Sequence, residues 1–323
     1  MIEFRTLKND ELEKWFDHCM YVFNEGIYSR EYRQYFVNHY NNDPWRDLDT
    51  ILVCMDDNKI ASTVRIFNRK IYLNSKEVSM GGIGEVSTKS EYRSQGLSTK
   101  LLEIAIEKMK NMGINVSILG AAQNKFGYYN RLGWDNIPRY FNASNVKGNN
   151  NFKFKIRPIN FETDITEIIS IYNNYSKKLN GTLVRNEKYY WENWVKNEAK
   201  NFYIVEDNNK IISYIDFEKN NNVIKIREFG ELLHSKSIFK ELLSKIVYLE
   251  GEEECKVIYP KIIKSELKIE EVIKEMGLMI NVINPFEFKG IKIENTKDFI
   301  QIFNNINKMQ DEELFTFWDI DGF

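Results

Sequence analysis

The chain carries an internal repeat, and this feature constrains its architecture more than any other. The segment IEFR at 2–5 returns about 152 residues later as FKIR at 154–157. Segments 53–62 and 205–213 keep almost the same spacing, and each reads as a strand, a polar turn and a second strand. Two repeated segments in register predict a duplicated domain, with chance likeness in an Asn- and Lys-rich sequence as the alternative.

The length of 323 residues fits two domains of ordinary size. A polar stretch at 142–151 contains the sequence NVKGNNN and is interpreted as a linker, because it offers little apolar surface to bury. We therefore expect a first domain at 1–148, a second domain at 152–290, and a C-terminal segment at 291–323 that docks back on the protein.

The composition argues against several kinds of partner. The 45 Lys and Arg residues against 47 Asp and Glu residues give a net charge of −2, so nucleic acid is not an expected partner. No apolar run has membrane-spanning length and charge begins at the N-terminus, which favours a cytoplasmic protein without a membrane partner. Cys19, Cys54 and Cys255 lack metal-ligand spacing, so we expect neither a disulfide framework nor a metal. A homo-oligomer is left open.

Hydrophobic spacing in the first half predicts helices, then strands, then a βαβα unit. The long helix is amphipathic and ends at Gly113, as helices often end at glycine. The expected elements, in chain order, are helices at 10–24 and 29–40, strands at 50–55, 59–68 and 78–86, a long helix at 97–112, a strand at 115–119 and a short helix at 126–132.

The most informative stretch is Arg93-Ser94-Gln95-Gly96-Leu97-Ser98, a turn that opens directly into the long helix. A helix N-terminus offers unpaired backbone N–H groups and a partial positive charge. Gly96 lets the backbone approach a ligand closely, and Arg93 adds a guanidinium group. The stretch has neither the Lys of a Walker loop nor the spacing of GxGxxG. It predicts a pyrophosphate-binding site of another kind.

This stretch resembles the coenzyme A loop, Q/R-x-x-G-x-G/A, of the Gcn5-related N-acetyltransferase (GNAT) superfamily. The match holds at Arg93 and Gly96, and Ser98 replaces the final Gly or Ala. A second GNAT signature, an Asn and then Tyr-x-Lys/Arg-x-Gly-Phe/Trp on a short helix, is matched by Asn124 and by Tyr129-Asn130-Arg131-Leu132-Gly133-Trp134. The two signatures follow in the family's order.

The resemblance implies a fold, a reaction and a set of site residues. The fold is α/β, with tandem GNAT folds that each form a mixed, mostly antiparallel twisted sheet flanked by helices. The reaction is acetyl transfer from acetyl-CoA to a primary amine of a small molecule or peptide, by direct attack. Tyr129 would be the general acid, since a phenol can protonate a departing thiolate. The implied cofactor-binding residues are Val86 and Thr88 for the acetyl carbonyl and pantetheine arm, Arg93, Ser94, Gln95, Gly96 and Leu97 for the pyrophosphate, and Ser98 and Asn124 beside them.

The second copy keeps the scaffold and lacks these residues. No Arg-x-x-Gly precedes its helix at 238–248, and Ile273 stands where Tyr129 would when the glycines are aligned. We expect this copy to bind no acetyl-CoA and to wall the acceptor site or an interface. One competent and one degenerate copy is similar to the Eis-like acetyltransferases, although 292–323 is too short for their sterol-carrier-like third domain.

The base that takes the amine's proton has two main candidates. In Eis-like enzymes a terminal carboxylate, often of Phe, reaches the active site, which implies Phe323; the alternative is that the aromatic tail at 315–323 is an apolar clamp. Several GNAT enzymes use a glutamate on the strand that here carries Glu85, although alternation along a strand could turn its side chain away. His18 and Glu25 are weaker candidates. His18, His39 and His234 show no triad or metal spacing and are expected to be structural.

Aromatic and acidic residues crowd the segment that would wall the acceptor site, and they suit a cationic amine. Half of the aromatic residues are expected to be core. A non-catalytic acyl-CoA-binding or sensory module is the alternative function, against which the retained Tyr129 argues. The acceptor candidates are Trp15, Tyr28, Tyr32, Tyr35, Phe36, Trp45, Asp43, Asp47 and Asp49.

Overall fold

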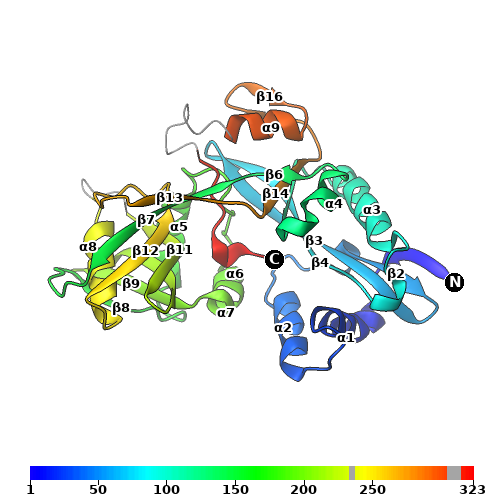
Figure 1. Cartoon of the computed structure of the whole chain (residues 1–323), viewed down its shortest axis with the longest axis horizontal. Helices are drawn as coiled ribbons and strands as arrows, with labels where there is room; N and C mark the ends of the chain where they lie inside the picture. Colours follow the sequence, from blue (N-terminus) through cyan, green and yellow to red (C-terminus); the bar gives the residue numbers. More distant parts are fainter. Residues whose placement is uncertain (233–236, 304–313) are drawn as a thin grey trace.

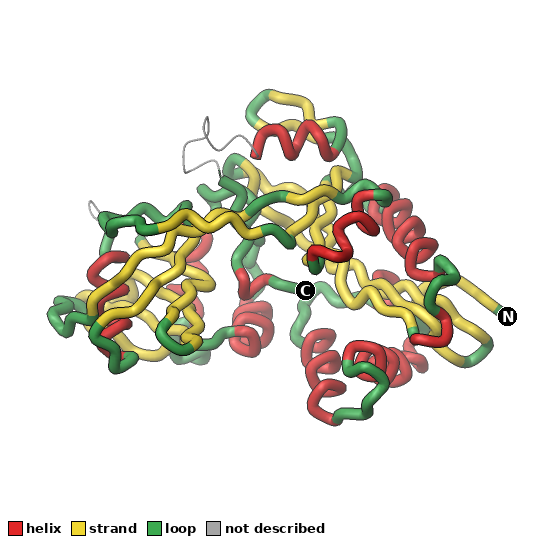
Figure 2. Tube along the Cα trace, in the orientation of Figure 1, coloured by secondary structure: helices red, strands yellow, loops and turns green. Residues whose placement is uncertain are grey.

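The computed structural model describes residues 1–232, 237–303 and 314–323, so His234 lies outside the described residues. The chain forms two seven-stranded sheets, each flanked by helices (Figures 1 and 2). Most neighbouring strands run antiparallel. Among the described strands each sheet has one parallel pair, β4–β5 in the first and β11–β12 in the second. The expected α/β fold of two mixed, mostly antiparallel sheets is confirmed.

Each sheet contains one strand from the other half of the chain, which we did not expect from the sequence. The first sheet has the order β1 (Ile2–Thr6), β2 (Ile51–Asp56), β3 (Lys59–Leu73), β4 (Lys76–Thr88), β5 (Val116–Gly120), β14 (Leu278–Val282) and β6 (Asp135–Asn136). The second has the order β13 (Glu271–Glu275), β7 (Arg139–Lys147), β12 (Glu254–Pro260), β11 (Val223–Glu231), β10 (Lys210–Asn220), β9 (Asn201–Asp207) and β8 (Lys155–Pro158).

The two sheets therefore exchange strands. β14 comes from the second half of the chain and pairs with β5 and β6, with Ile280 opposite Ile118. β7 comes from the first half and pairs with β12 and β13. The ranges 1–148 and 152–290 each contribute to both sheets, which ties the halves together through backbone hydrogen bonds.

The interpretation of 142–151 as a linker was wrong for most of that range, because β7 runs through it. Asn142 and Ser144 are 5% and 1% exposed, so these polar residues lie inside the fold. Phe141, Ala143 and Val146 are also buried. Other parts of the protein cover both faces of the strand. Its polar residues made the segment resemble a linker in the sequence.

The helices lie close to their expected positions. Alternate residues of β2 explain how helices cover both faces of the first sheet: Val53 packs with α1 and α2, and Cys54 packs with α3. The helices are α1 (Leu12–Phe23), α2 (Arg30–Asn41), α3 (Leu97–Asn111), α4 (Phe126–Asn130), α5 (Ile165–Ser176), α6 (Lys188–Tyr190), a π-helical turn (Trp191–Val195), α7 (Lys196–Glu198), α8 (Phe239–Leu249) and α9 (Thr296–Phe303).

The C-terminal residues join the two halves. After the small hairpin of β15 (Phe286–Phe288) and β16 (Ile291–Ile293) and then α9, residues 314–323 run inward, and the chain ends between the two sheets (Figure 1). One core cluster contains Phe67 of β3, Trp194 of the second half and Trp318 of this segment. The centre of the molecule is thus built from three separate parts of the sequence.

Candidate active site

β4 and β5 pair over three residues and then separate. Their parallel pairing runs from Met80 opposite Val116 to Gly82 opposite Ile118, and β4 then continues to Thr88 without β5 beside it. In open α/β sheets, ligands bind where neighbouring strands diverge at their carboxyl ends. The candidate active site is therefore the end of β4 and the loop that follows.

A bulge shapes the end of β4. Arg65 of β3 pairs with Gly84 and Thr63 pairs with Ser87, so one residue of β3 faces two residues of β4, Glu85 and Val86. Glu85 has φ 52°, which is uncommon for a residue with a side chain. The bulge places Glu85 toward α2 while Val86 packs on the α3 side.

The predicted cofactor loop lies at the N-terminus of α3. Gly96 is the N-cap residue and has φ 74°, a left-handed conformation that favours glycine. No side chain caps the helix, so its first N–H groups are left for a ligand. Arg93, Ser94 and Gln95 are exposed beside it, and the Arg93 Nε donates to the Thr88 carbonyl at 3.3 Å. This geometry suits an anion such as pyrophosphate.

Tyr129 lies on α4, a helix that is hydrogen-bonded to the first turn of α3. The hydroxyl of its neighbour Tyr128 donates to Ser98 Oγ at 2.9 Å. Burial, and secondarily Tyr128, raises the pKa of Tyr129 to about 12, so its phenol keeps its proton at neutral pH. Asn124 is exposed in the turn before α4, and Leu97 is buried in the core below the loop.

Phe323 reaches β4 on the face opposite α3. A Cβ added at Gly82 would lie 2.7 Å from its ring, and one added at Gly84 would lie 3.2 Å from its carboxyl carbon. The two glycines make room for this residue. Phe323 therefore packs against Gly84, the residue that comes just before Glu85 and the bulge.

Buried charges surround Glu85. His39 Nδ1 lies 2.9 Å from Glu85 Oε1, and the Arg65 Nη1 lies 3.4 Å from the same oxygen. The other oxygen, Oε2, is buried and has no hydrogen-bond partner among the described residues. Arg65 and Arg69 both pair with Asp43, at 2.8 and 2.9 Å. The sequence separation of 46 residues between His39 and Glu85 concealed this contact, which the spacing of His39 did not predict.

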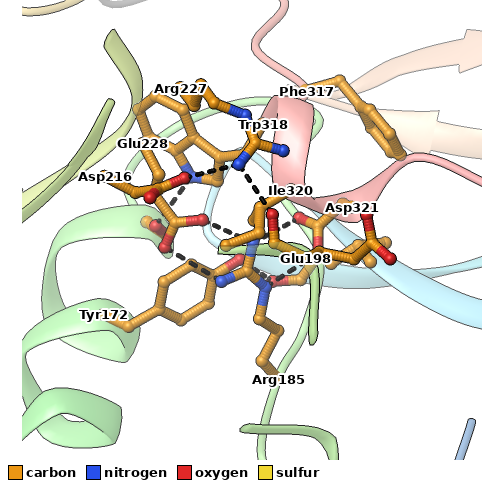
Figure 3. Close-up of polar contacts among 12 residues, drawn as sticks. Tyr172, Arg185, Glu198, Asp216, Arg227, Glu228, Phe317, Trp318, Ile320 and Asp321 are labelled. Carbon is orange, nitrogen blue, oxygen red and sulfur yellow. Dashed lines mark hydrogen bonds and ion pairs between the residues drawn. The ribbon is translucent and has the colours of Figure 1, made fainter. Parts of the chain in front are cut away.

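A second buried network holds the C-terminal segment (Figure 3). Arg185 donates to both oxygens of Glu228, at 2.9 and 2.7 Å, and its Nε donates to Asp321 at 2.9 Å. Tyr190 also donates to Asp321, and Trp194 Nε1 donates to the Ile320 carbonyl. Burial raises the pKa of Glu228 to about 7, although Arg185 acts in the opposite direction. This network fixes the chain two residues before Phe323.

A pocket of about 280 Å³ opens beside Phe323. It reaches Gly120 at the end of β5 and is bordered by residues of the second half and of the C-terminal segment. Arg139 lies on its wall between Glu275 and Asp319, with ion-pair distances of 2.5 and 2.6 Å. The pocket thus combines ion-paired and apolar lining residues next to the point where β4 and β5 diverge.

The predicted acceptor wall is only partly assembled. Trp15 and Phe36 lie in the core, and Asp43 is buried in its ion pairs. Tyr28, Tyr32 and Tyr35 are exposed, as are Asp47 and Asp49, while Trp45 stacks over Arg69.

His18 is buried, with its ring nitrogens next to Ile60 O and Ser87 Oγ, and burial lowers its pKa to about 4. Both ring nitrogens of His18 are thus engaged inside the fold. Glu25 is exposed after α1.

The second half lacks the corresponding site residues. Ile273 lies in β13, paired with Phe141, rather than on a helix like α4. The loop before α8 falls partly at 233–236, outside the described residues. No group of three or more His, Cys, Asp or Glu side chains in the described part of the chain could hold a metal ion. None of the helices in that part is both long and apolar enough to span a membrane.

Comparisons with known proteins agree with this geometry. Residues 3–137 match the family model of the acetyltransferase (GNAT) domain, whereas no curated protein matches the sequence. A probable N-acyltransferase from Enterococcus faecalis superposes with a TM-score of 0.69 at 15% identity, over 88% of this chain and 73% of that chain. A GCN5-related N-acetyltransferase from Anabaena variabilis gives 0.67 at 16% identity, over 88% and 73%.

A third structure, Eis1 from Mycobacterium abscessus, gives a TM-score of 0.59 at 12% identity, over 88% of this chain and 74% of that chain. At these low identities the superpositions show a common fold alone, and the domain match gives the family of residues 3–137. Residues 3–137 accordingly form an acetyltransferase (GNAT) domain, and the chain as a whole has the tandem fold of these structures.

Proposed function

We propose that the protein is an acetyl-CoA-dependent N-acetyltransferase that acts on a primary amine of a small molecule or peptide, in the cytoplasm. The observation that carries this proposal is the hydrogen bond of 2.9 Å between Tyr128 on α4 and Ser98 in the first turn of α3. It fixes the helix of the proposed acid, Tyr129, to the helix that would hold the cofactor. A binding or sensory module would need only the cofactor-binding helix, α3.

The loop before α3 supplies the cofactor contacts in this proposal. The uncapped N–H groups of α3, together with Arg93, attract the pyrophosphate, and the residues Ser94 to Gln95 line its approach. The backbone of Val86 and Thr88 then binds the pantetheine arm and polarises the acetyl carbonyl. Oriented N–H donors of this kind stabilise the oxyanion that forms when the amine attacks.

The chemistry is a direct transfer. The neutral amine attacks the thioester carbonyl, the new C–N bond forms, and the C–S bond breaks to release the thiolate. Tyr129 gives its proton to the thiolate. The raised pKa of Tyr129 would make it a weaker acid in water. In a site with little solvent the departing thiolate is a strong base, and proton transfer from Tyr129 to it is then well matched.

The proton of the amine is taken by Glu85, in the bulge of β4, or by the carboxylate of Phe323, which packs against Gly84 just before the bulge. Glu85 keeps one buried oxygen without a partner, and a water molecule would have to join it to the amine. Phe323 borders the pocket beside β5, which we propose as the acceptor pocket.

Thiol release from acetyl-CoA, measured against a panel of polyamines, aminoglycosides and lysine peptides, tests the proposed function. We expect turnover with at least one amine, and loss of that turnover in Tyr129→Phe. Tight binding of acetyl-CoA with no release of thiol for any amine would instead support the sensory module. Failure to bind acetyl-CoA would refute both.

A further inference from the structure

We propose that His39 is a positioning residue for acetyl transfer, which holds Glu85 and so fixes the β4 bulge whose next residue, Val86, contacts the thioester. This inference rests on the proposed function and adds a residue to it. His39 belongs to α2, outside both sequence signatures.

The contact between His39 and Glu85 has a defined direction. A carboxylate that is to act as a base only accepts hydrogen bonds, so in the proposed mechanism the proton between the two groups belongs to His39 Nδ1. The distance of 2.9 Å is that of a well-formed bond, and both side chains are 4% exposed. A buried charge-assisted bond of this kind is strong and directional. It restrains the orientation of the Glu85 side chain.

A bond that holds the Glu85 side chain also holds the backbone of the β4 bulge. Glu85 is one of the two residues of β4 that face Val64, and its φ of 52° is a conformation that needs support from its surroundings. Apart from its backbone pairing, Glu85 is held by His39 and by Arg65 at 3.4 Å. Loss of the His39 donor would leave the longer contact alone. The backbone of Val86 would then lose its fixed direction.

His39 is itself held from both halves of the chain. Its ring stacks on Tyr35 at 5.3 Å and lies 4.5 Å from Trp194, which belongs to the second half. Phe67 packs against its edge at 5.3 Å, and the same Phe67 stacks on Phe323. The second half therefore contributes to the active site through His39, in addition to any part it has in binding the acceptor.

Two substitutions separate positioning from packing. His39→Asn keeps an N–H donor near the place of Nδ1 and loses most of the ring. His39→Phe keeps a ring among Tyr35, Phe67 and Trp194 and loses the donor. If His39 only fills space, His39→Phe is the milder change for both stability and activity. If His39 positions Glu85, His39→Asn is the more active of the two variants although His39→Phe is the more stable.

We expect kcat to fall at least about tenfold in His39→Phe, since small misplacements of reacting groups cost up to about a hundredfold. His39→Asn should stay within about threefold of wild type in kcat, although its melting temperature should be the lower of the two. If the variant with the higher melting temperature, His39→Phe, also has the higher kcat, the inference is overturned. So would wild-type kcat in His39→Phe.

A binding measurement keeps the inference testable if no amine is acetylated. Calorimetry with acetyl-CoA and with 3′-phospho-ADP, which lacks the pantetheine arm, compares contacts to β4 with contacts to the α3 loop. His39→Phe should weaken acetyl-CoA and leave 3′-phospho-ADP unchanged, whereas His39→Asn should change neither. Equal affinities for acetyl-CoA in wild type and His39→Phe would refute the role of His39 without bearing on acetyl transfer itself.

Discussion

The ring of Phe323 stacks on the ring of Phe67, with centroids 5.3 Å apart and planes inclined by 21°. Both rings lie against glycines of β4, because an added Cβ would come 2.7 Å from Phe323 at Gly82 and 2.8 Å from Phe67 at Gly84. A strand rarely gains from glycine, so the absence of side chains here serves the close approach of the C-terminal segment.

Gly82→Ala should displace Phe323 from β4. The new Cβ would overlap the ring, and overpacking of this kind costs about 1–3 kcal/mol. We expect a lower melting temperature and slower acetylation. Gly127→Ala is the matched control, because its Cβ meets no atom within 4 Å. If Gly82→Ala unfolds and turns over like the control, Phe323 does not occupy this place.

Arg93→Ala should weaken acetyl-CoA binding without changing stability. The side chain is exposed and makes one hydrogen bond, to the Thr88 carbonyl at 3.3 Å, so the fold depends little on it. A charge-assisted contact to phosphate is worth about 1.5–3 kcal/mol, which corresponds to a loss of affinity of roughly ten- to a hundredfold. Calorimetry measures this, with Lys100→Ala on the same helix as the control cation. Unchanged affinity would mean that the loop is wrongly assigned.

Tyr129→Phe should lower kcat by about ten- to ten-thousand-fold, the range of general acid–base groups, and leave acetyl-CoA affinity near wild type. The ring and its packing against Trp134 are preserved, so only the proton is lost. Tyr128→Phe loses the bond to Ser98 instead and should cost less in kcat. Equal turnover in Tyr129→Phe and wild type would mean that another group protonates the thiolate.

Local patterns in the sequence predicted much of this fold. Periodicity and the glycines Gly96 and Gly113 placed α3 and its loop to within a residue or two, because helix ends depend on neighbours in the chain. The exchange of β7 and β14 could not be predicted, since strand partners are chosen by tertiary contacts between distant residues. The pair of His39 and Glu85 was hidden for the same reason.

The network of Figure 3 should make stability depend on pH. The pKa of Glu228 in the folded protein, about 7, lies above its ordinary value of 4.5, mainly because of burial. The folded state therefore binds the extra proton between these values, so this group's contribution to stability is present below about pH 4.5 and is lost as pH rises through 7. Thermal unfolding of Glu228→Gln at pH 5 to 8 should lack this slope.

Arg185→Met should be far more harmful than Glu228→Gln. It leaves the carboxylates of Glu228 and Asp321 buried without their cation, and removing one partner of a buried pair costs about 3–5 kcal/mol. Denaturant unfolding measures the difference. Equal stability of the two variants would mean that Arg185 is not needed to hold Glu228 and Asp321 in the core.

The last prediction concerns the carboxylate of Phe323. A glycine added after Phe323 moves this carboxylate and keeps the ring, whereas Phe323→Ala removes the ring and keeps the carboxylate. If the carboxylate takes the amine's proton, the added glycine should lower kcat/KM for amines at least about tenfold, with acetyl-CoA affinity and melting temperature near wild type. A terminal carboxyl has an ordinary pKa of about 3.3–3.7, so it acts as a base at neutral pH only where low polarity or a bridging water raises its basicity.

If the segment is only an apolar clamp, Phe323→Ala should lower the melting temperature and the added glycine should be tolerated. Full activity in the extended chain would exclude Phe323 as the base and leave Glu85, whose replacement in Glu85→Gln should then lower kcat by about a hundredfold or more.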